Sequence, residues 1–118
     1  MGTFRVRIEI GDPQGERFEA VEALVDTGAS HTALPASVLR ELGIEPYERG
    51  AFRLADGRLV ELDIGQTWVQ VNGKRAITQV VFADEATEPL LGAVTLEQLG
   101  LGIDPVTKQL IPVPRLLM

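Results

Sequence analysis

The chain has 118 residues, which is the size of one domain, and 45% of them are hydrophobic, so that we expect a single globular domain over residues 1–118. A formal net charge of −6 argues against a nucleic-acid partner, because binding phosphates requires clustered lysines and arginines. The chain has no cysteine and one histidine, which excludes disulfides, cysteine nucleophiles and most zinc sites, and we expect neither a metal nor a cofactor.

The first part of the chain predicts two strands and a short helix. Apolar and polar residues alternate over 4–10, the turn 11–15 follows, and residues 18–25 return as a second strand. A helix is expected to open at Leu34-Pro35, since proline is tolerated in the first helical turn, and Gly43 is placed to end it.

The middle of the chain predicts two β-hairpins. Asp56-Gly57 and Asn72-Gly73 are both dipeptides that favour tight hairpin turns between strand-like runs. The expected strands cover residues 52–54, 59–64, 67–71 and 76–82.

The last part predicts a second strand-to-helix corner and a final hairpin. Leu90-Leu91 leads into Gly92, and a short helix carrying Leu96 and Leu99 is expected to end at Gly100. Residues 103–105 and 109–113 are expected to form the final hairpin around the turn 106–108.

The two halves of the chain resemble each other weakly. An apolar pair precedes Asp26 and another, Leu90-Leu91, precedes Gly92, and each half continues into a helix that ends in Leu-Gly. This pattern predicts two related units about an approximate twofold axis. The alternative, that short helices often end in Leu-Gly, stays open.

The tripeptide Asp26-Thr27-Gly28 is the most informative motif of the chain. The apolar run 23–25 precedes it, so the pattern puts a carboxylate at the end of a buried strand, on a turn that glycine makes tight. An aspartate in such a turn can also serve only to cap local amides. The chain holds one such tripeptide, so a site with two carboxylates requires a second copy of the chain.

The neighbours Ser30 and His31 give little support for a serine hydrolase. In an extended segment their side chains point to opposite faces, so we expect no hydrogen bond between them as nucleophile and base. The role of His31 is left open.

These residues carry a resemblance to the retropepsin-like aspartic proteases. The resemblance runs from Asp26-Thr27-Gly28-Ala29-Ser30, through a hairpin centred on Ala55-Asp56-Gly57 at the family's flap position, to Leu90-Leu91-Gly92 and its helix. The closing stretch 99–112 resembles prokaryotic members. Membership implies a mainly β fold, a closed retropepsin-like barrel with a flap hairpin and one or two short helices.

The resemblance also implies a function and a set of site residues. Two chains would form one active site, in which a dyad of Asp26 activates water for peptide-bond hydrolysis in a peptide or protein substrate. Thr27 and Gly28 would support the catalytic loop. The substrate-binding residues would be Ala29, Ser30, Ala55, Asp56 and Gly57. Leu34, Leu90 and Leu91 are candidates for apolar substrate pockets, although core packing is the favoured role for them.

Two features depart from the viral pattern. Viral members carry an acidic residue at the position of Ser30 and an arginine at that of Ala93, and the resulting ion pair braces the dimer. The turn Ala55-Asp56-Gly57-Arg58 is more polar than viral flaps. Bracing and substrate grip therefore do not transfer from the resemblance.

Other functions remain possible on the same fold. The main alternative is a non-catalytic homodimeric peptide-binding or regulatory module, and a purely structural β-barrel subunit is a third. The chain shows no secretory signal and no apolar stretch of about 18 residues. We therefore expect a cytoplasmic location and no membrane partner.

Overall fold

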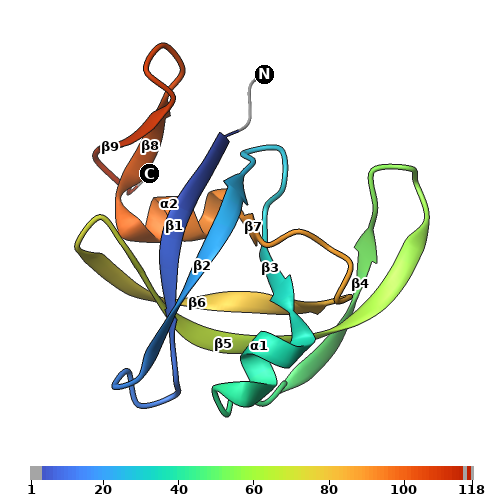
Figure 1. The fold of residues 1–118 in the computed structure, drawn as a ribbon. Coiled ribbons are helices and arrows are strands. Elements are labelled where there is room, and N and C mark those ends of the chain that lie inside the picture. Colours follow the sequence, from blue (N-terminus) through green and yellow to red (C-terminus); the bar gives the residue numbers. More distant parts are fainter. Residues whose placement is uncertain (1–3, 116, 118) are drawn as a thin grey trace.

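The computed structural model describes residues 4–115 and 117, and it is mainly β, as expected (Figure 1). In chain order the elements are β1 (Phe4–Gly11), β2 (Phe18–Val25), β3 (Thr32–Pro35), α1 (Ala36–Glu41), β4 (Glu48–Arg53), β5 (Leu59–Val71), β6 (Lys74–Ala83), β7 (Leu90–Leu91), α2 (Ala93–Leu99), β8 (Leu101–Asp104) and β9 (Gln109–Pro112).

One sheet holds seven of these strands, and its pairing returns on itself. The order is β1-β2-β7-β3-β6-β5-β4, and β1 also pairs with β5, where Ile10 lies opposite Val69. The ring of paired strands therefore leaves β4 outside, where it pairs with β5 alone. Figure 1 shows this β4–β5 hairpin projecting from the body of the protein. The predicted barrel with a flap hairpin and two short helices is confirmed.

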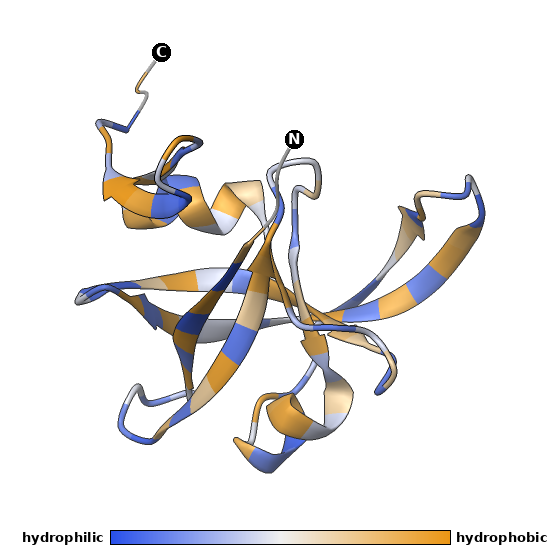
Figure 2. Cartoon of the chain, turned by 45° about the horizontal axis from the view of Figure 1, so that its top comes forward, coloured by the Kyte–Doolittle hydropathy of each residue, from blue (hydrophilic) through white to orange (hydrophobic). Residues whose placement is uncertain are grey.

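The core lies inside this ring because one face of each strand is apolar. Figure 2 shows hydrophobic and hydrophilic residues alternating along the strands. Ile8, Ile10, Val25 and Val69 are fully buried, and Leu39 from α1 packs in the same cluster. Burial of this apolar surface is the main force that holds the sheet closed.

The predicted turns form where the sequence placed them. Asn72 and Gly73 both adopt positive φ, 51° and 79°, the backbone conformation that a tight two-residue hairpin requires. Gly100 ends α2 in the left-handed conformation with φ 70°.

Several predicted boundaries were wrong. The strand expected over 52–54 is β4 over Glu48–Arg53, and the one expected over 103–105 is β8 over Leu101–Asp104. Residues 59–71 form one continuous strand, without the expected break near Gly65. A Cβ on Gly65 would lie 2.9 Å from the Phe82 ring, so this glycine serves close packing and not a turn. Leu34 and Pro35 belong to β3, which was not expected, and α1 begins one residue later.

The strand pairing supports two related units. β2 pairs with β7 and β3 pairs with β6, both in parallel, so each unit contributes one strand to the other. A helix follows β3 and another follows β7, as the repeat predicted. The detailed match was wrong, however, because Leu90-Leu91 corresponds in this arrangement to β3 and not to the end of β2.

Candidate active site

Asp26 lies directly after the last residue of β2, Val25, and lines a cleft. Its amide donates to the Leu91 carbonyl at 3.3 Å, and its Oδ1 accepts the Gly28 amide at 2.9 Å. Its Oδ2 has no hydrogen-bond partner within residues 4–115 and 117. One carboxylate oxygen thus caps a local amide, as the turn interpretation expects, and the other is available to water or to a second carboxylate.

Residues 26–31, which we call the acid loop, rest on the first turn of α2. The amides of Ala93 and Val94 donate to the carbonyls of Ala29 and Ser30 at 2.9 and 3.0 Å. These are amides that a helix start leaves without an internal partner, so the loop and the helix satisfy each other. The backbones approach closely, since a Cβ on Gly92 would lie 2.5 Å from the carbonyl carbon and oxygen of His31.

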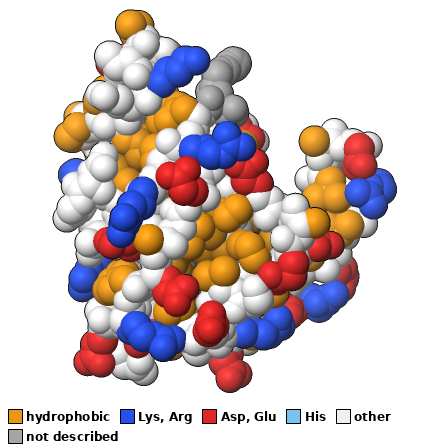
Figure 3. All heavy atoms as spheres, viewed as in Figure 1, with side chains coloured by type: hydrophobic (Ala, Val, Ile, Leu, Met, Phe, Trp, Pro, Cys, Tyr) orange, Lys and Arg blue, Asp and Glu red, His pale blue; other side chains and the backbone are white. Residues whose placement is uncertain are grey.

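A cleft of about 530 Å³ separates the acid loop from the flap hairpin. Figure 3 shows the notch between the flap and the body of the molecule. The sequence-predicted residues that line the cleft are Asp26, Gly28, Ala29, Ser30, Ala55 and Leu90.

Asp56 and Gly57 lie at the tip of the flap and do not line this cleft in the single chain. Asp56 accepts bonds from the amide and Nε of Arg58, at 3.0 and 2.8 Å. The Arg58 amide, followed by its guanidinium, lowers the pKa of Asp56. In the single chain Asp56 therefore stabilises the flap turn.

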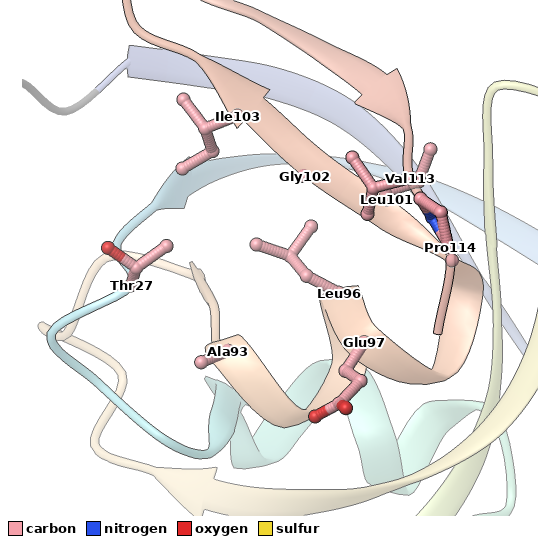
Figure 4. Close-up of a pocket in the computed structure, with 10 residues that line it drawn as sticks. Thr27, Ala93, Leu96, Glu97, Leu101, Gly102, Ile103, Val113 and Pro114 are labelled. Atoms are coloured by element: carbon pink, nitrogen blue, oxygen red, sulfur yellow. The ribbon is translucent and has the colours of Figure 1, made fainter. Parts of the chain in front are cut away.

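Thr27 faces away from the cleft and lines a second, mainly apolar pocket of about 270 Å³. Figure 4 shows Thr27 on one side of this pocket and Val113 and Pro114 on the other, with Leu96 from α2 between them. The remaining lining residues include Ile103 and Leu101 of β8. Asp26 thus lines the cleft beneath the flap, and Thr27 lines a separate pocket.

Sequence analysis missed several cleft residues that come from other strands. Phe52 and Leu54 lie on the flap, and Leu62 and Val81 lie on β5 and β6. The two-residue spacing of 52 and 54 was a usable signal, because such residues share one face of a strand. Leu34 and Leu91 are fully buried, which agrees with the favoured core role.

The expectation for Ser30 and His31 was wrong. Ser30 Oγ and His31 Nδ1 lie 3.1 Å apart in a hydrogen bond, because the loop bends here and is not extended. The His31 ring also packs edge-on against Phe52, with centroids 5.4 Å apart. Within the part of the chain that the structure describes, no carboxylate hydrogen-bonds to His31, so a serine-hydrolase triad lacks its third member.

The residues that the structure describes, 4–115 and 117, show neither a metal cluster nor a helix that could span a membrane. No group of three or more His, Cys, Asp or Glu side chains among them could hold a metal ion. None of their helices has the length and apolar character required to cross a bilayer.

Comparison with known proteins points to one family. The sequence model of the family described as gag-polyprotein putative aspartyl protease matches residues 16–98. The fold is similar to the solution structure of simian foamy virus (mac) protease, with a TM-score of 0.56 and 18% identity over 79% of this chain and 91% of that chain. It is also similar to the crystal structure of a retropepsin-like aspartic protease from Rickettsia conorii, with a TM-score of 0.54 and 24% identity over 87% of this chain and 88% of that one. No curated protein sequence matches the chain.

Proposed function

The chain belongs to the family of gag-polyprotein putative aspartyl proteases, and from this premise we propose that it is an aspartic endopeptidase that acts as a homodimer. The catalytic unit is two copies of the single domain of residues 1–118, each contributing one Asp26. The observation that carries the proposal is the position of Asp26, with one carboxylate oxygen free, on the floor of a cleft that the flap overhangs.

A pair of Asp26 carboxylates can supply both an acid and a base. Two full charges about 3 Å apart repel by roughly 5 kcal/mol at an effective dielectric near 20, so the pair retains one proton, as is general for aspartic proteases. The ionised member removes a proton from water, which attacks the peptide carbonyl carbon. The neutral member donates its proton to the carbonyl oxygen, and a proton then passes to the leaving nitrogen.

Two features of the chain support a dimer. Each chain has only one Asp-Thr-Gly tripeptide, so a single copy supplies half of a dyad. The pocket beside Thr27 includes Val113, which is 38% exposed, and Val94 of α2 and Ile111 of β9 are exposed by 44 and 37%. Figure 3 shows hydrophobic side chains gathered over β8 and β9.

The hairpin β8–β9 adds unpaired strand edges to this surface. Within the described residues, β8 and β9 pair with each other and with no other strand. An open edge next to an apolar pocket is a surface that a second copy can cover. Because Ser30 and Ala93 lack the charges of viral members, we propose that apolar packing around Thr27 braces this dimer.

The cleft is suited to an extended peptide. The backbone of the acid loop at Ala29 and Ser30 and the flap residue Ala55 line it from opposite sides. A peptide bound between them would hydrogen-bond as an added strand, and its apolar side chains would contact Phe52 and Leu90. Asp56 and Gly57 would join the substrate-binding set only when the flap closes over the peptide.

The direct test replaces Asp26 by Asn, which keeps the shape of the side chain and removes its charge. We expect peptide cleavage to be lost while circular dichroism and sedimentation show an intact fold and dimer. Cleavage by Asp26→Asn at the wild-type rate would end the catalytic assignment.

The second candidate is a non-catalytic homodimeric peptide-binding module, favoured by the bond that Asp26 Oδ1 accepts from Gly28. A peptide mimic with a hydroxyl at the scissile carbon separates the two functions. A catalytic dyad binds this transition-state mimic at least about 100-fold more tightly than the parent peptide. Equal affinities for the two ligands would favour the binding module.

A cytoplasmic location also stays a prediction.

A further inference from the structure

Three buried threonines form a hydrogen-bonded chain behind the acid loop. Thr32 in β3, Thr95 in α2 and Thr78 in β6 are at most 2% exposed. Thr32 Oγ1 lies 2.6 Å from Thr95 Oγ1, which lies 2.8 Å from Thr78 Oγ1. These hydroxyls join three elements that are far apart in the sequence.

One assignment of donors and acceptors satisfies all three hydroxyls. Each hydroxyl has a single proton to donate. In this assignment Thr78 donates to the Gln79 carbonyl at 3.3 Å and Thr95 donates to Thr78 at 2.8 Å. Thr32 donates to Thr95 in the same assignment, and its lone pair accepts the Gly92 amide at 3.0 Å. Every hydroxyl is satisfied, and every bond depends on its neighbour.

The chain ends on the backbone that carries the acid loop. Thr32 is the first residue after the loop, and Gly92 is the residue that packs against His31. The next two amides, those of Ala93 and Val94, are the ones that hold the loop carbonyls. A displacement of Thr32 relative to α2 would therefore move the acid loop as a whole.

We propose that Thr95 is a positioning residue for catalysis, which sets the height of the acid loop on α2 through Thr32 and so the separation of the two Asp26 carboxylates. The inference rests on the proposed function. A carboxylate pair is sensitive to small displacements, since about 1 Å of misplacement can cost about 100-fold in rate.

Thr67 offers a matched control. It is 2% exposed and lies opposite Thr78 on the neighbouring strand, but its hydroxyl donates to the Gly11 carbonyl at 2.9 Å. Thr67→Val therefore removes a buried hydroxyl of the same kind but none of the hydrogen bonds that link Thr78, Thr95 and Thr32.

The experiment compares Thr95→Val, Thr95→Ser and Thr67→Val as purified dimers, with active sites titrated by a tight-binding inhibitor. For Thr95→Val we expect kcat to fall by about 10- to 100-fold per active site with KM within about twofold, and the pH–rate profile to change shape. Thr95→Ser restores kcat to within about threefold, because it keeps the hydroxyl. Thr67→Val lowers the unfolding midpoint but keeps the wild-type kcat and pH profile.

Amide hydrogen exchange gives a readout that does not need activity. We expect Gly92, Ala93 and Val94 to exchange about 10-fold faster in Thr95→Val and at the wild-type rate in Thr67→Val. If Thr95→Val does not fold, Thr78→Val replaces it, with a loss of kcat of about threefold and faster exchange at the same amides.

Several outcomes would overturn the inference. One is a wild-type kcat and pH profile in Thr95→Val, or in Thr78→Val where that variant replaces it. Another is a loss of kcat in Thr67→Val as large as that in Thr95→Val. The third is a kcat of Thr95→Ser as low as that of Thr95→Val. Failure of the proposed function looks different, because then the wild type does not cleave peptides or Asp26→Asn cleaves them equally well. The exchange rates would still show whether the hydroxyl chain holds the acid loop.

Discussion

Replacing Gly92 by alanine should destabilise the protein strongly, although its backbone conformation suits any residue. Gly92 has φ −93° and ψ 172°, which is ordinary extended backbone, so the substitution adds no conformational strain. The added Cβ, however, would lie 2.5 Å from the carbonyl carbon and oxygen of His31 and 2.8 Å from the Ser30 oxygen. All three are backbone atoms, which cannot rotate away.

The expected magnitude follows from the contacts that must open. Relieving the overlap costs about 1–3 kcal/mol, and separating the acid loop from α2 weakens the bonds from Ala93 and Val94, at about 1 kcal/mol each. The free energy of unfolding should therefore fall by about 3–5 kcal/mol. For a domain of this size, that corresponds to a decrease in Tm of about 12–20 °C.

The assay is urea unfolding of wild type and variant at one protein concentration, because a dimer unfolds in a concentration-dependent way. Gly50→Ala is the matched control, since the one close contact of its Cβ would be with the flexible end of Ile64, at 2.9 Å. We expect this control within about 1 kcal/mol of wild type. A Gly92→Ala protein as stable as Gly50→Ala would refute the argument that the backbones meet here.

Two further predictions concern stability in acid and the dimer. The hydroxyl and amide of Ser37 lower the pKa of Glu85, so this contact stabilises the fold fully above pH 4.5 and is lost as pH falls through the depressed folded-state value. Glu85→Gln should therefore reduce the urea midpoint at pH 6, and the difference from wild type should shrink as the pH falls below 4.5. Ile103→Asp, in the pocket beside Thr27, should raise the dimer dissociation constant by about 10- to 100-fold in sedimentation, with the monomer still folded. Ile77→Asp, on an exposed part of β6, should not; equal effects of the two would place the dimer surface elsewhere.

Much of the fold could be predicted because its signals are local. Asn72-Gly73 carries the positive φ of a tight turn in its own residue types, and Gly100 ends α2 for the same reason. The alternation of apolar and polar residues predicts a strand whichever neighbouring strands it pairs with.

Pairing between distant segments could not be read in the same way. The four residues of β3 have no period long enough to recognise, and they form a strand because β6 and β7 lie on either side of it. Gly65 resembles a turn residue in the sequence, but its role depends on Phe82, which lies 17 residues away.

In the candidate site, too, features contiguous in the sequence could be predicted, and features that depend on the folded chain could not. Asp26 and its loop could be predicted, because the motif and the preceding apolar strand are contiguous in the sequence. The bond between Ser30 and His31 depends on a bend that the residue types do not specify. The pairing of Thr95 with Thr32 and Thr78 appears only when α2 is packed against the sheet.

The central claim, that two chains share one dyad, is tested most directly by mixing wild type with Asp26→Asn. Equal amounts are unfolded together, refolded to exchange subunits at random, and assayed at a concentration where sedimentation shows dimers. If both carboxylates are required, only dimers of two wild-type chains cleave. Random exchange makes these about one quarter of all dimers, so activity falls to about one quarter of that of a purely wild-type sample at the same total protein concentration. Activity of about one half would mean that each chain works alone and would contradict the account.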